Sequence, residues 1–329
     1  MTTALEVLFR HGGRLAAAKA AFPDAPQPWI DLSTGINPRP WRGARAASAD
    51  LRRLPDPEAV AALEAAAARS FGAAPAAVAA VPGAEAGLRL LPRLTGARSA
   101  AIVAPTYGGH AEAWAAAGVA AAAVRDLDDD RAAEALVAVN PNNPDGSAIP
   151  PGRLAAQAAR RWVIVDESFG ETVPDLTLAS RAGGRLVVLR SFGKFYGLPG
   201  VRLGFVVAEP ALAARVRAAF GDWPVGAEAL AAAPGAYADE AWRARTVRRL
   251  AGDAARLDAR LAAAGFEVLG GTSLFRLARR RDAAAAFRAL AGRGVLARPF
   301  RDHPHWLRFG LPAPGQWPRV EAALQELRP

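Results

Sequence analysis

Short polar segments that could carry out chemistry follow several apolar runs in the middle of the chain. Apolar runs of this length are typical of buried strands, so each polar segment should lie at the carboxyl end of a strand. Ligands bind at that edge of an open α/β sheet, so together these amine, amide, phenol and carboxylate groups indicate a ligand site. The segments are Pro105-Thr106-Tyr107, Asn140-Pro141-Asn142-Asn143-Pro144-Asp145-Gly146, Asp166-Glu167-Ser168 and Ser191-Phe192-Gly193-Lys194, with Arg202 eight residues after Lys194.

Lys194 stands out because the chain contains almost no lysine. Lys and Arg together number 41, and only Lys19 and Lys194 are lysines. Arginine stays protonated, whereas lysine can lose its proton, act as a nucleophile and form an imine. A lysine that is retained in so arginine-rich a chain therefore indicates chemistry that arginine cannot perform.

Each polar segment taken alone also has a purely structural explanation. Asn-Pro-rich sequences form turns without any ligand. An aspartate at a strand end often caps a helix, and a lysine in a loop is usually solvated. The occurrence of all of them at successive strand ends favours a common site over these separate explanations.

The elements that position these segments alternate between strands and helices. Such alternation predicts an α/β fold with a mostly parallel sheet. The expected strands are 76–81, 100–103, 136–139, 162–165, 186–189 and 203–207, and the expected helices between them are 58–69, 84–94, 111–117 and 153–160.

The pattern changes after about residue 210, where a smaller α+β domain is expected. We predict an N-terminal arm over 1–40 that joins this smaller domain, a large domain over 41–215 and a small C-terminal domain over 216–329. Helices are expected at 210–220, 239–264, 282–291 and 317–327, and strands at 273–277 and 306–309.

Composition narrows the class of protein further. The 329 residues include no Cys, which excludes disulfides, thiolate metal sites and a cysteine nucleophile, and no metal is expected. We find neither a signal peptide nor an apolar run of the roughly 20 residues that a membrane helix needs, so we expect a cytoplasmic protein. The net charge of +10 is dispersed, which favours anionic small molecules as ligands over nucleic acid or membrane.

The arrangement of polar segments resembles the fold type I pyridoxal-phosphate (PLP) enzymes, the aspartate-aminotransferase-like superfamily. The resemblance implies catalytic roles for two residues: Lys194 would form the internal aldimine with PLP and move the proton at Cα, and Asp166 would pair with the pyridinium nitrogen. Asn143 would hydrogen-bond the 3-oxygen of the ring, and Tyr107 would stack on the ring. His110 matches a residue that braces the aspartate in relatives; the alternative is a polar residue at a helix start.

The same resemblance implies a site for the PLP phosphate. Gly83-Ala84-Glu85 lie between a strand and a helix, where backbone N–H groups at the helix start face an anion. Ser191 and Arg202 would complete the site with a hydroxyl and a guanidinium group.

Four further segments are similar to the threonine-phosphate decarboxylases of cobalamin biosynthesis, which are relatives of histidinol-phosphate aminotransferases. They are His11-Gly12-Gly13, the stretch 31–38, the stretch 294–298 and the stretch 305–310. That family converts L-threonine O-3-phosphate to (R)-1-amino-2-propanol O-2-phosphate and CO₂, and its active sites lie at the interface of a homodimer. The resemblance implies that substrate is contacted by His11, Gly12, Asn37, Asn143, Arg298 and Arg308.

Without the resemblance these residues have simpler explanations: a flexible N-terminal turn, and two arginines among many. The chain also departs from its relatives at two places. Phe169 ends the Asp-Glu segment where many aminotransferases have Tyr, and Leu54 precedes Pro55-Asp56 where relatives have the Tyr that reaches the partner's PLP phosphate. The first departure favours a decarboxylase, and the second weakens the case for a shared phosphate contact.

Three other classes of protein are alternatives to a decarboxylase. An aminotransferase, acting on histidinol phosphate or an aromatic amino acid, would use the same PLP residues and is the main alternative. A transcriptional regulator on this fold would carry an N-terminal DNA-binding domain, and only about thirty residues precede the motifs here. An NAD enzyme is disfavoured because no G-x-G-x-x-G follows an early strand.

Overall fold

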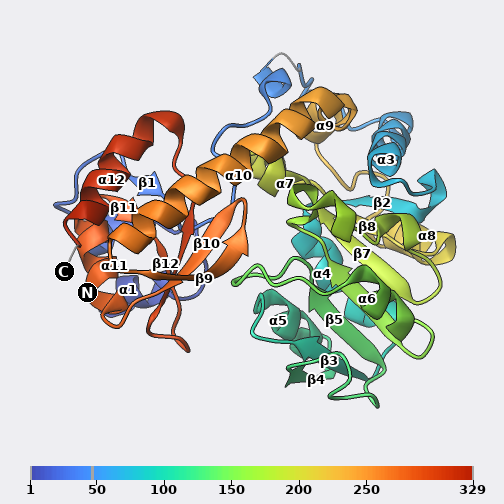
Figure 1. Ribbon diagram of the computed structural model, residues 1–329. Coiled ribbons are helices and arrows are strands. Elements are labelled where there is room, and N and C mark those ends of the chain that lie inside the picture. The colour runs from blue at the N-terminus through green and yellow to red at the C-terminus, as the bar shows by residue number, and fades with distance from the viewer. Residues whose placement is uncertain (1, 46–47, 328–329) are drawn as a thin grey trace. The chain divides into compact units, whose positions relative to one another are not determined.

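The structure, a computed structural model, describes residues 2–45 and 48–327. Within these residues the chain divides into two compact units (Figure 1). One unit takes in the described residues of Met1–Arg39, Pro144–Gly146 and Arg245–Pro329, and the other takes in those of Pro40–Asn143 and Ser147–Ala244. No helix in the described part of the chain is both long and apolar enough to cross a membrane.

The larger unit contains a seven-stranded sheet in the order β2-β8-β7-β6-β5-β3-β4. All neighbouring pairs are parallel except those made by β8, which runs antiparallel to β2 and β7. The prediction of a mostly parallel α/β sheet is therefore confirmed. The strands are β2 (Val78–Val81), β3 (Ser99–Val103), β4 (Ala120–Val124), β5 (Ala135–Val139), β6 (Trp162–Asp166), β7 (Leu186–Ser191) and β8 (Gly204–Val207).

Helices cover both faces of this sheet. Alternate residues of a strand point to opposite faces, so each strand packs against helices on both sides. Val206 of β8 belongs to a core cluster with Leu88, whereas its neighbour Phe205 makes edge-on ring contacts with Phe71 and Tyr237. Apart from the edge strand β4, whose first four residues are exposed, the strands are thus largely buried on both sides, which explains their near-continuous apolar sequences. The helices are α3 (Pro57–Phe71), α4 (Ala84–Thr95), α5 (Gly109–Ala116), α6 (Pro151–Gln157), α8 (Pro210–Phe220) and α9 (Ala227–Ala238).

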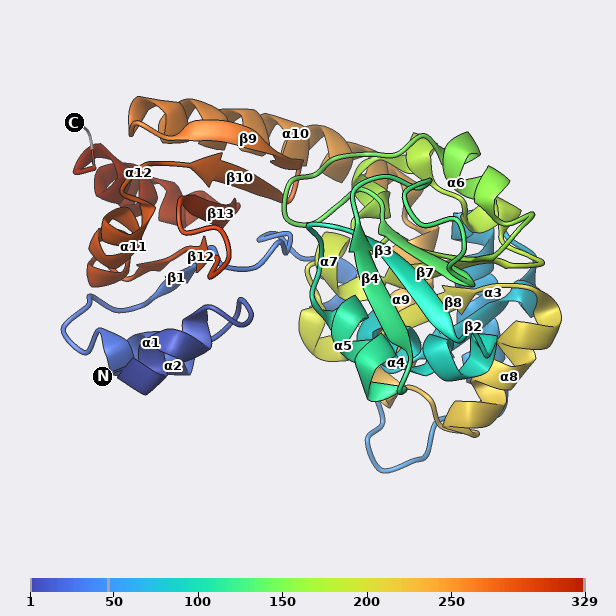
Figure 2. The same ribbon diagram turned by 90° about the horizontal axis from the view of Figure 1, so that it is seen from below.

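The smaller unit is built on a four-stranded antiparallel sheet in the order β12-β13-β10-β9. A separate parallel pair, β1 with β11, joins the N-terminal segment to the C-terminal part of the chain. Figure 2 shows α1 and α2 side by side in this unit. The elements are α1 (Thr2–Leu8), α2 (Leu15–Ala21), β1 (Ile30–Asp31), α10 (Glu240–Ala263), β9 (Glu267–Thr272), β10 (Phe275–Arg279), α11 (Ala283–Gly292), β11 (Val295–Leu296), β12 (Arg298–Pro299), β13 (Trp306–Gly310) and α12 (Trp317–Gln325).

Helix α9 and strand β4 of the larger unit were not expected from the sequence. Helix α9 contains Pro234, a residue that usually ends or kinks a helix, but Tyr237 in its last turn packs into the aromatic cluster around Phe205. Strand β4 lies within a long Ala-rich run. Gly118, at φ 74°, lies in this run between the end of α5 and the start of β4. Both α8 and α9 belong to the unit that contains the large sheet.

Candidate active site

Asp166 is the last residue of β6, and its carboxylate is the most deeply buried charged group among the expected cofactor ligands. Its Oδ2 lies 3.1 Å from His110 Nε2, and its Oδ1 accepts a hydrogen bond of 2.9 Å from the Ser168 backbone N–H. Asp166 and His110 are 5% and 2% exposed. The structure therefore brings His110 against Asp166, as the resemblance implied.

These contacts decide the charge of the buried carboxyl. Burial alone would raise the pKa of Asp166, because it disfavours the ionised form. The hydrogen bond and charge of His110, with the hydrogen bonds of Ser168, outweigh that effect and leave the pKa below its usual range. Asp166 is thus an anion at neutral pH, which is the state needed to pair with a protonated ring nitrogen.

An ion network that the sequence did not reveal fixes the ends of β6 and β7. Arg190 in β7 lies 2.8 Å from a carboxylate oxygen of Glu167 and 2.8 Å from one of Glu171, and all three side chains are buried. Glu167 also accepts hydrogen bonds from the Thr177 hydroxyl and the Leu178 N–H, each 2.6 Å long. Arg190 directly precedes Ser191, and Glu167 directly follows Asp166. The network therefore fixes the backbone next to Ser191 and Asp166, which are two of the expected cofactor ligands.

Lys194 lies on the four-residue helix α7 (Phe192–Phe195), which follows β7 directly. Phe192 and Phe195 are buried within an aromatic cluster, where Phe192 stacks on Tyr196 with ring centroids 4.6 Å apart. Lys194 itself is only partly buried, and its Nζ lies 6.0 Å from the ring centroid of Phe169. The phenylalanine that replaces the usual tyrosine of aminotransferases is thus close to the expected imine-forming lysine.

Gly83, Arg202 and Gly204 shape a cradle at the N-terminus of α4. Gly83 has a φ of 88°, and a Cβ there would lie 2.5 Å from Arg202 Nη2; a Cβ on Gly204 would lie 2.2 Å from the backbone nitrogen of Ala84. Gly204 is the register partner of Ser191 across β7 and β8. A helix start, a guanidinium and a hydroxyl therefore converge where only glycine fits, as an anion site requires.

Tyr107 and Glu85 lie next to this cradle. The Tyr107 hydroxyl donates a hydrogen bond of 3.1 Å to Glu85 Oε2, and Glu85 Oε1 accepts one of 2.7 Å from Arg89. The Tyr107 ring meets the His110 ring edge-on, with centroids 6.2 Å apart. Burial and the Glu85 carboxylate raise the pKa of Tyr107, so its hydroxyl stays protonated and its ring stays beside the Asp166–His110 pair.

Side-chain amides hold the Asn-rich loop after β5 in one conformation. Asn140 bonds Ile149 twice, since its Nδ2 donates to the Ile149 carbonyl at 3.0 Å and its Oδ1 accepts from the Ile149 N–H at 2.9 Å. Asn142 Oδ1 accepts from the Thr106 hydroxyl at 2.6 Å. Asn143 follows in this fixed loop and is partly exposed. The turn explanation of the motif thus holds for Asn140 and Asn142.

The remaining candidates, His11, Gly12, Asn37, Arg298 and Arg308, lie in the smaller unit. Arg298 and Arg308 are directly opposite each other in the β12–β13 ladder. Arg308 Nη2 donates to the Ser33 carbonyl at 2.8 Å, while Arg298 donates to the carbonyls of Leu8, Arg10 and Pro299 at 2.7, 2.8 and 2.9 Å. Burial lowers the pKa of each arginine to about 10, so both remain cationic at neutral pH.

The His11-Gly12-Gly13 segment packs closely on residues of the 31–38 stretch. A Cβ on Gly12 would lie 2.2 Å from the Ser33 carbonyl oxygen, and the Gly13 N–H donates to the Ser33 hydroxyl at 2.8 Å. Ser33 in turn donates to Asp31. Gly12 and Gly13 thus both contact Ser33, and His11, the first residue of the segment, is half-buried.

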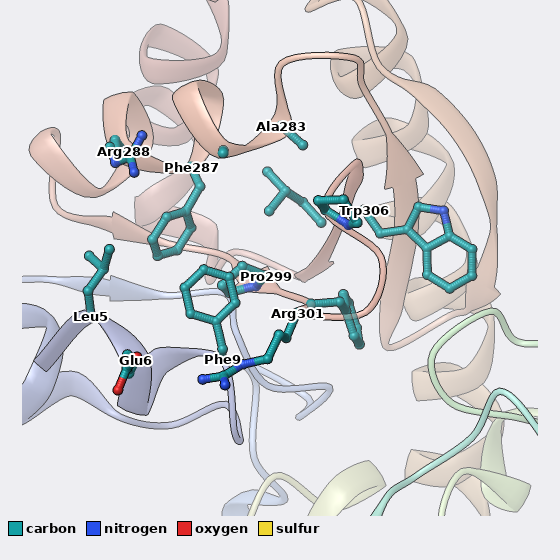
Figure 3. Close-up of a pocket in the computed structure, with 13 residues that line it drawn as sticks. Leu5, Glu6, Phe9, Ala283, Phe287, Arg288, Pro299, Arg301 and Trp306 are labelled. Atoms are coloured by element: carbon teal, nitrogen blue, oxygen red, sulfur yellow. The ribbon is translucent and has the colours of Figure 1, made fainter. Parts of the chain in front are cut away.

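A separate cavity of about 320 Å³ lies in the smaller unit (Figure 3). Its walls are mainly apolar and aromatic, and they come from α1, α11, β12 with the loop that follows it, and β13. None of the expected site residues lines it, although its residues Pro299 and Phe300 both contact the Arg298 side chain. Figure 3 labels Leu5, Phe9, Phe287 and Trp306 among its lining residues.

The donor set in the larger unit fits PLP: an ionised carboxylate for the pyridine nitrogen, a lysine for the aldehyde and a glycine cradle for the phosphate. The fold and this donor set define a fold type I PLP enzyme. The chain belongs to the aminotransferase class I and II family, whose sequence pattern matches residues 17–327.

Its relatives include threonine-phosphate decarboxylases. The protein of that name from Sinorhizobium sp is 42% identical over 315 residues, which cover 92% of each chain. The one from Pseudomonas aeruginosa is 36% identical over 329 residues, which cover 96% of this chain and 97% of the relative. Among solved structures, the histidinol-phosphate aminotransferase of Sinorhizobium meliloti in complex with pyridoxal-5'-phosphate shares the fold, with a TM-score of 0.83 and 22% identity over 95% of this chain and 93% of that one.

The Asp166–His110 contact predicts how the enzyme responds to pH. His110→Ala removes the larger of the interactions that lower the pKa of Asp166 and leaves only the Ser168 hydrogen bonds to oppose burial, so the carboxylate becomes protonated at a higher pH. The acid limb of the kcat/KM profile should move upward by roughly one to two pH units, given about 1.5–3 kcal/mol for a charged hydrogen bond. His305→Ala, which alters an exposed histidine, is the control. An unchanged acid limb in His110→Ala would contradict the assignment.

Proposed function

We propose that this protein is a PLP-dependent carboxy-lyase that converts L-threonine O-3-phosphate to (R)-1-amino-2-propanol O-2-phosphate and CO₂, a step in cobalamin biosynthesis. The observation that carries the proposal is 42% and 36% identity to two threonine-phosphate decarboxylases over more than nine-tenths of the chain. Two opposed arginines that remain cationic while largely desolvated suit a substrate with two anionic groups.

The residues of the larger unit would divide the chemistry between them. When bound, PLP supplies an electron sink for the pair that remains at Cα once the bond to the carboxylate has broken. Asp166 holds a proton at the ring nitrogen, and His110 keeps Asp166 ionised. Lys194 carries the cofactor and then delivers the proton that replaces CO₂ at Cα. Asn143 and Tyr107 orient the ring, and Gly83, Ala84, Glu85, Ser191 and Arg202 form the phosphate site.

The residues of the smaller unit would hold the substrate. Arg298, Arg308, His11, Asn37 and the Gly12 backbone surround its carboxylate and phosphate with donors. The bond that breaks must lie perpendicular to the ring plane, so these anchors decide whether Cα loses CO₂ or a proton. An aminotransferase would share the residues of the larger unit and differ here, and it therefore remains the alternative reaction.

The product formed from a single substrate separates the two reactions. PLP-loaded protein mixed with L-threonine O-3-phosphate, without any oxo acid, should release CO₂ and the aminopropanol phosphate in equal amounts. Unphosphorylated threonine should react about 10³-fold more slowly or worse, because the cations built for the phosphate would be left unpaired. Turnover that requires 2-oxoglutarate, and yields glutamate without CO₂, would establish the aminotransferase instead.

Lys194 should be the residue that carries the cofactor. Borohydride reduction of the PLP-loaded protein followed by peptide mapping should place the pyridoxyl group on Lys194. The second lysine of the chain, Lys19, is the internal control, since it lies on α2 in the smaller unit. A label on Lys19 would overturn the assignment of the whole site.

We also propose that the working enzyme is a cytoplasmic homodimer, as is usual for this superfamily. Leu51 and Leu54 are 71% and 69% exposed in the larger unit, and a partner subunit would cover such side chains. Light scattering at assay concentration should report twice the mass of one chain. A fully active monomer would refute the dimer.

A further inference from the structure

The cavity in the smaller unit has the size and the lining of a site for a small molecule. Its volume of about 320 Å³ lies at the lower end of the roughly 300–1,000 Å³ that ligand pockets span. Phe9 directly after α1, Phe287 on α11 and Phe300 in the loop after β12 belong to its wall (Figure 3). Phe9 and Phe300 are only partly buried, so a ligand with an aromatic body would cover ring surface that the fold leaves accessible.

The charged residues of the lining favour an anion. Arg288 on α11 and Arg301 in the loop after β12 line the cavity, and Glu6 is the single acidic residue among the described lining residues. In the part of the chain that the structure describes, no acidic group pairs with either arginine, whereas Arg293 at the end of α11 pairs with Glu326 at 2.7 Å. A ligand with an aromatic body and one acidic group therefore matches both parts of the lining.

Arg298 joins two walls of the cavity that come from opposite ends of the chain. Its Nη1 donates to the carbonyls of Leu8 and Pro299 at 2.7 and 2.9 Å, and its Nη2 donates to that of Arg10 at 2.8 Å. Its guanidinium carbon lies 5.2 Å from the ring centroid of Phe300, which lines the cavity. One guanidinium group thus holds the α1 wall against the β12 wall.

The position of α1 depends on such contacts, because a helix of seven residues is not stable in water by itself. A molecule in the cavity would contact α1 and the loop after β12 at the same time. The cavity is present while Arg298 makes its three hydrogen bonds, so a ligand that fits it favours the arrangement in which Arg298 is held.

We propose that the cavity is a regulatory site for a small molecule with an aromatic body and one acidic group. The bound molecule lowers the KM for the substrate, because it holds α1 against β12 and thereby fixes Arg298. This second part rests on the proposed role of Arg298 as a substrate contact, whereas the binding site itself does not. The expected cofactor and substrate residues lie outside the described lining, so the molecule and the substrate bind at different places.

An introduced thiol tests the binding site, because the chain contains no Cys that would contribute a background. Ala284 is an exposed lining position on α11, and the next residue, Ala285, is exposed but is not among the described lining residues. Indole-3-propionate should slow the alkylation of Ala284→Cys by iodoacetamide several-fold and leave that of Ala285→Cys unchanged. The neutral indole-3-propionamide should bind more weakly, because it lacks the acidic group.

Arginine variants in the Ala284→Cys background test the charge of the lining. Arg288→Ala combined with Arg301→Ala should weaken protection by indole-3-propionate roughly 5-fold, which is the size expected for an exposed ion pair. The matched control combines Arg281→Ala with Arg293→Ala, which removes two exposed arginines outside the described lining and should leave protection unchanged.

Steady-state kinetics on the PLP-loaded, otherwise unaltered enzyme test the regulation. Indole-3-propionate should lower the KM for O-phospho-L-threonine about 5-fold and change kcat little. An Ala284→Cys thiol that is not protected, or is protected no better than the Ala285→Cys thiol, would overturn the binding site. Protection of Ala284→Cys with an unchanged or raised KM would overturn the regulatory role. Thiol protection needs no turnover, so it is independent of whether the enzyme decarboxylates O-phospho-L-threonine.

Discussion

The buried negative charge of Asp166 is the feature on which the rest of the larger unit depends. A carboxylate at 5% exposure loses most of its hydration, and the fold must replace what water supplied. His110 from α5 and the Ser168 backbone do so at its two oxygens. Next to it, Arg190 of β7 forms ion pairs with Glu167, which follows β6, and with Glu171. The fold therefore buries a charge that these neighbours stabilise in place of water.

In the smaller unit, by contrast, the buried charge is positive. Arg298 and Arg308 face each other across two strands, and Arg308 is 8% exposed. Arg298 donates to the carbonyls of Leu8 and Arg10, and Arg308 donates to that of Ser33, which fixes the direction of each guanidinium group. Burial lowers the pKa of both groups, so binding an anion relieves a cost that is already present in the free protein. This arrangement suits the substrate with two anionic groups that is proposed above.

The sequence predicted the residues at strand ends well and the long-range contacts poorly. Lys194, Asp166 and Gly83 could be placed because each follows an apolar run, and strand ends meet at one edge of a parallel sheet. The prediction missed α9, which contains Pro234, a residue that usually ends or kinks a helix. It also missed β4, whose Ala-rich sequence shows no alternation of apolar and polar residues. Neither the Glu167–Arg190–Glu171 network nor the Arg249–Asn37 bond leaves a local pattern, because their partners come together only through tertiary folding.

The division of residues between the two units explains how one fold can serve two reactions. The groups proposed to bind the ring and phosphate of PLP all lie in the larger unit, and a decarboxylase and an aminotransferase need them equally. The proposed anion contacts, apart from Asn143, lie in the smaller unit, and on the proposed function they are the contacts in which the two reactions would differ. Gly12 fits against the Ser33 carbonyl only because it has no Cβ. Arg298 donates hydrogen bonds to the carbonyls of Leu8 and Arg10, on either side of Phe9. Together these contacts fix the backbone that leads to His11. The proposed substrate contacts of the smaller unit thus depend on its backbone packing.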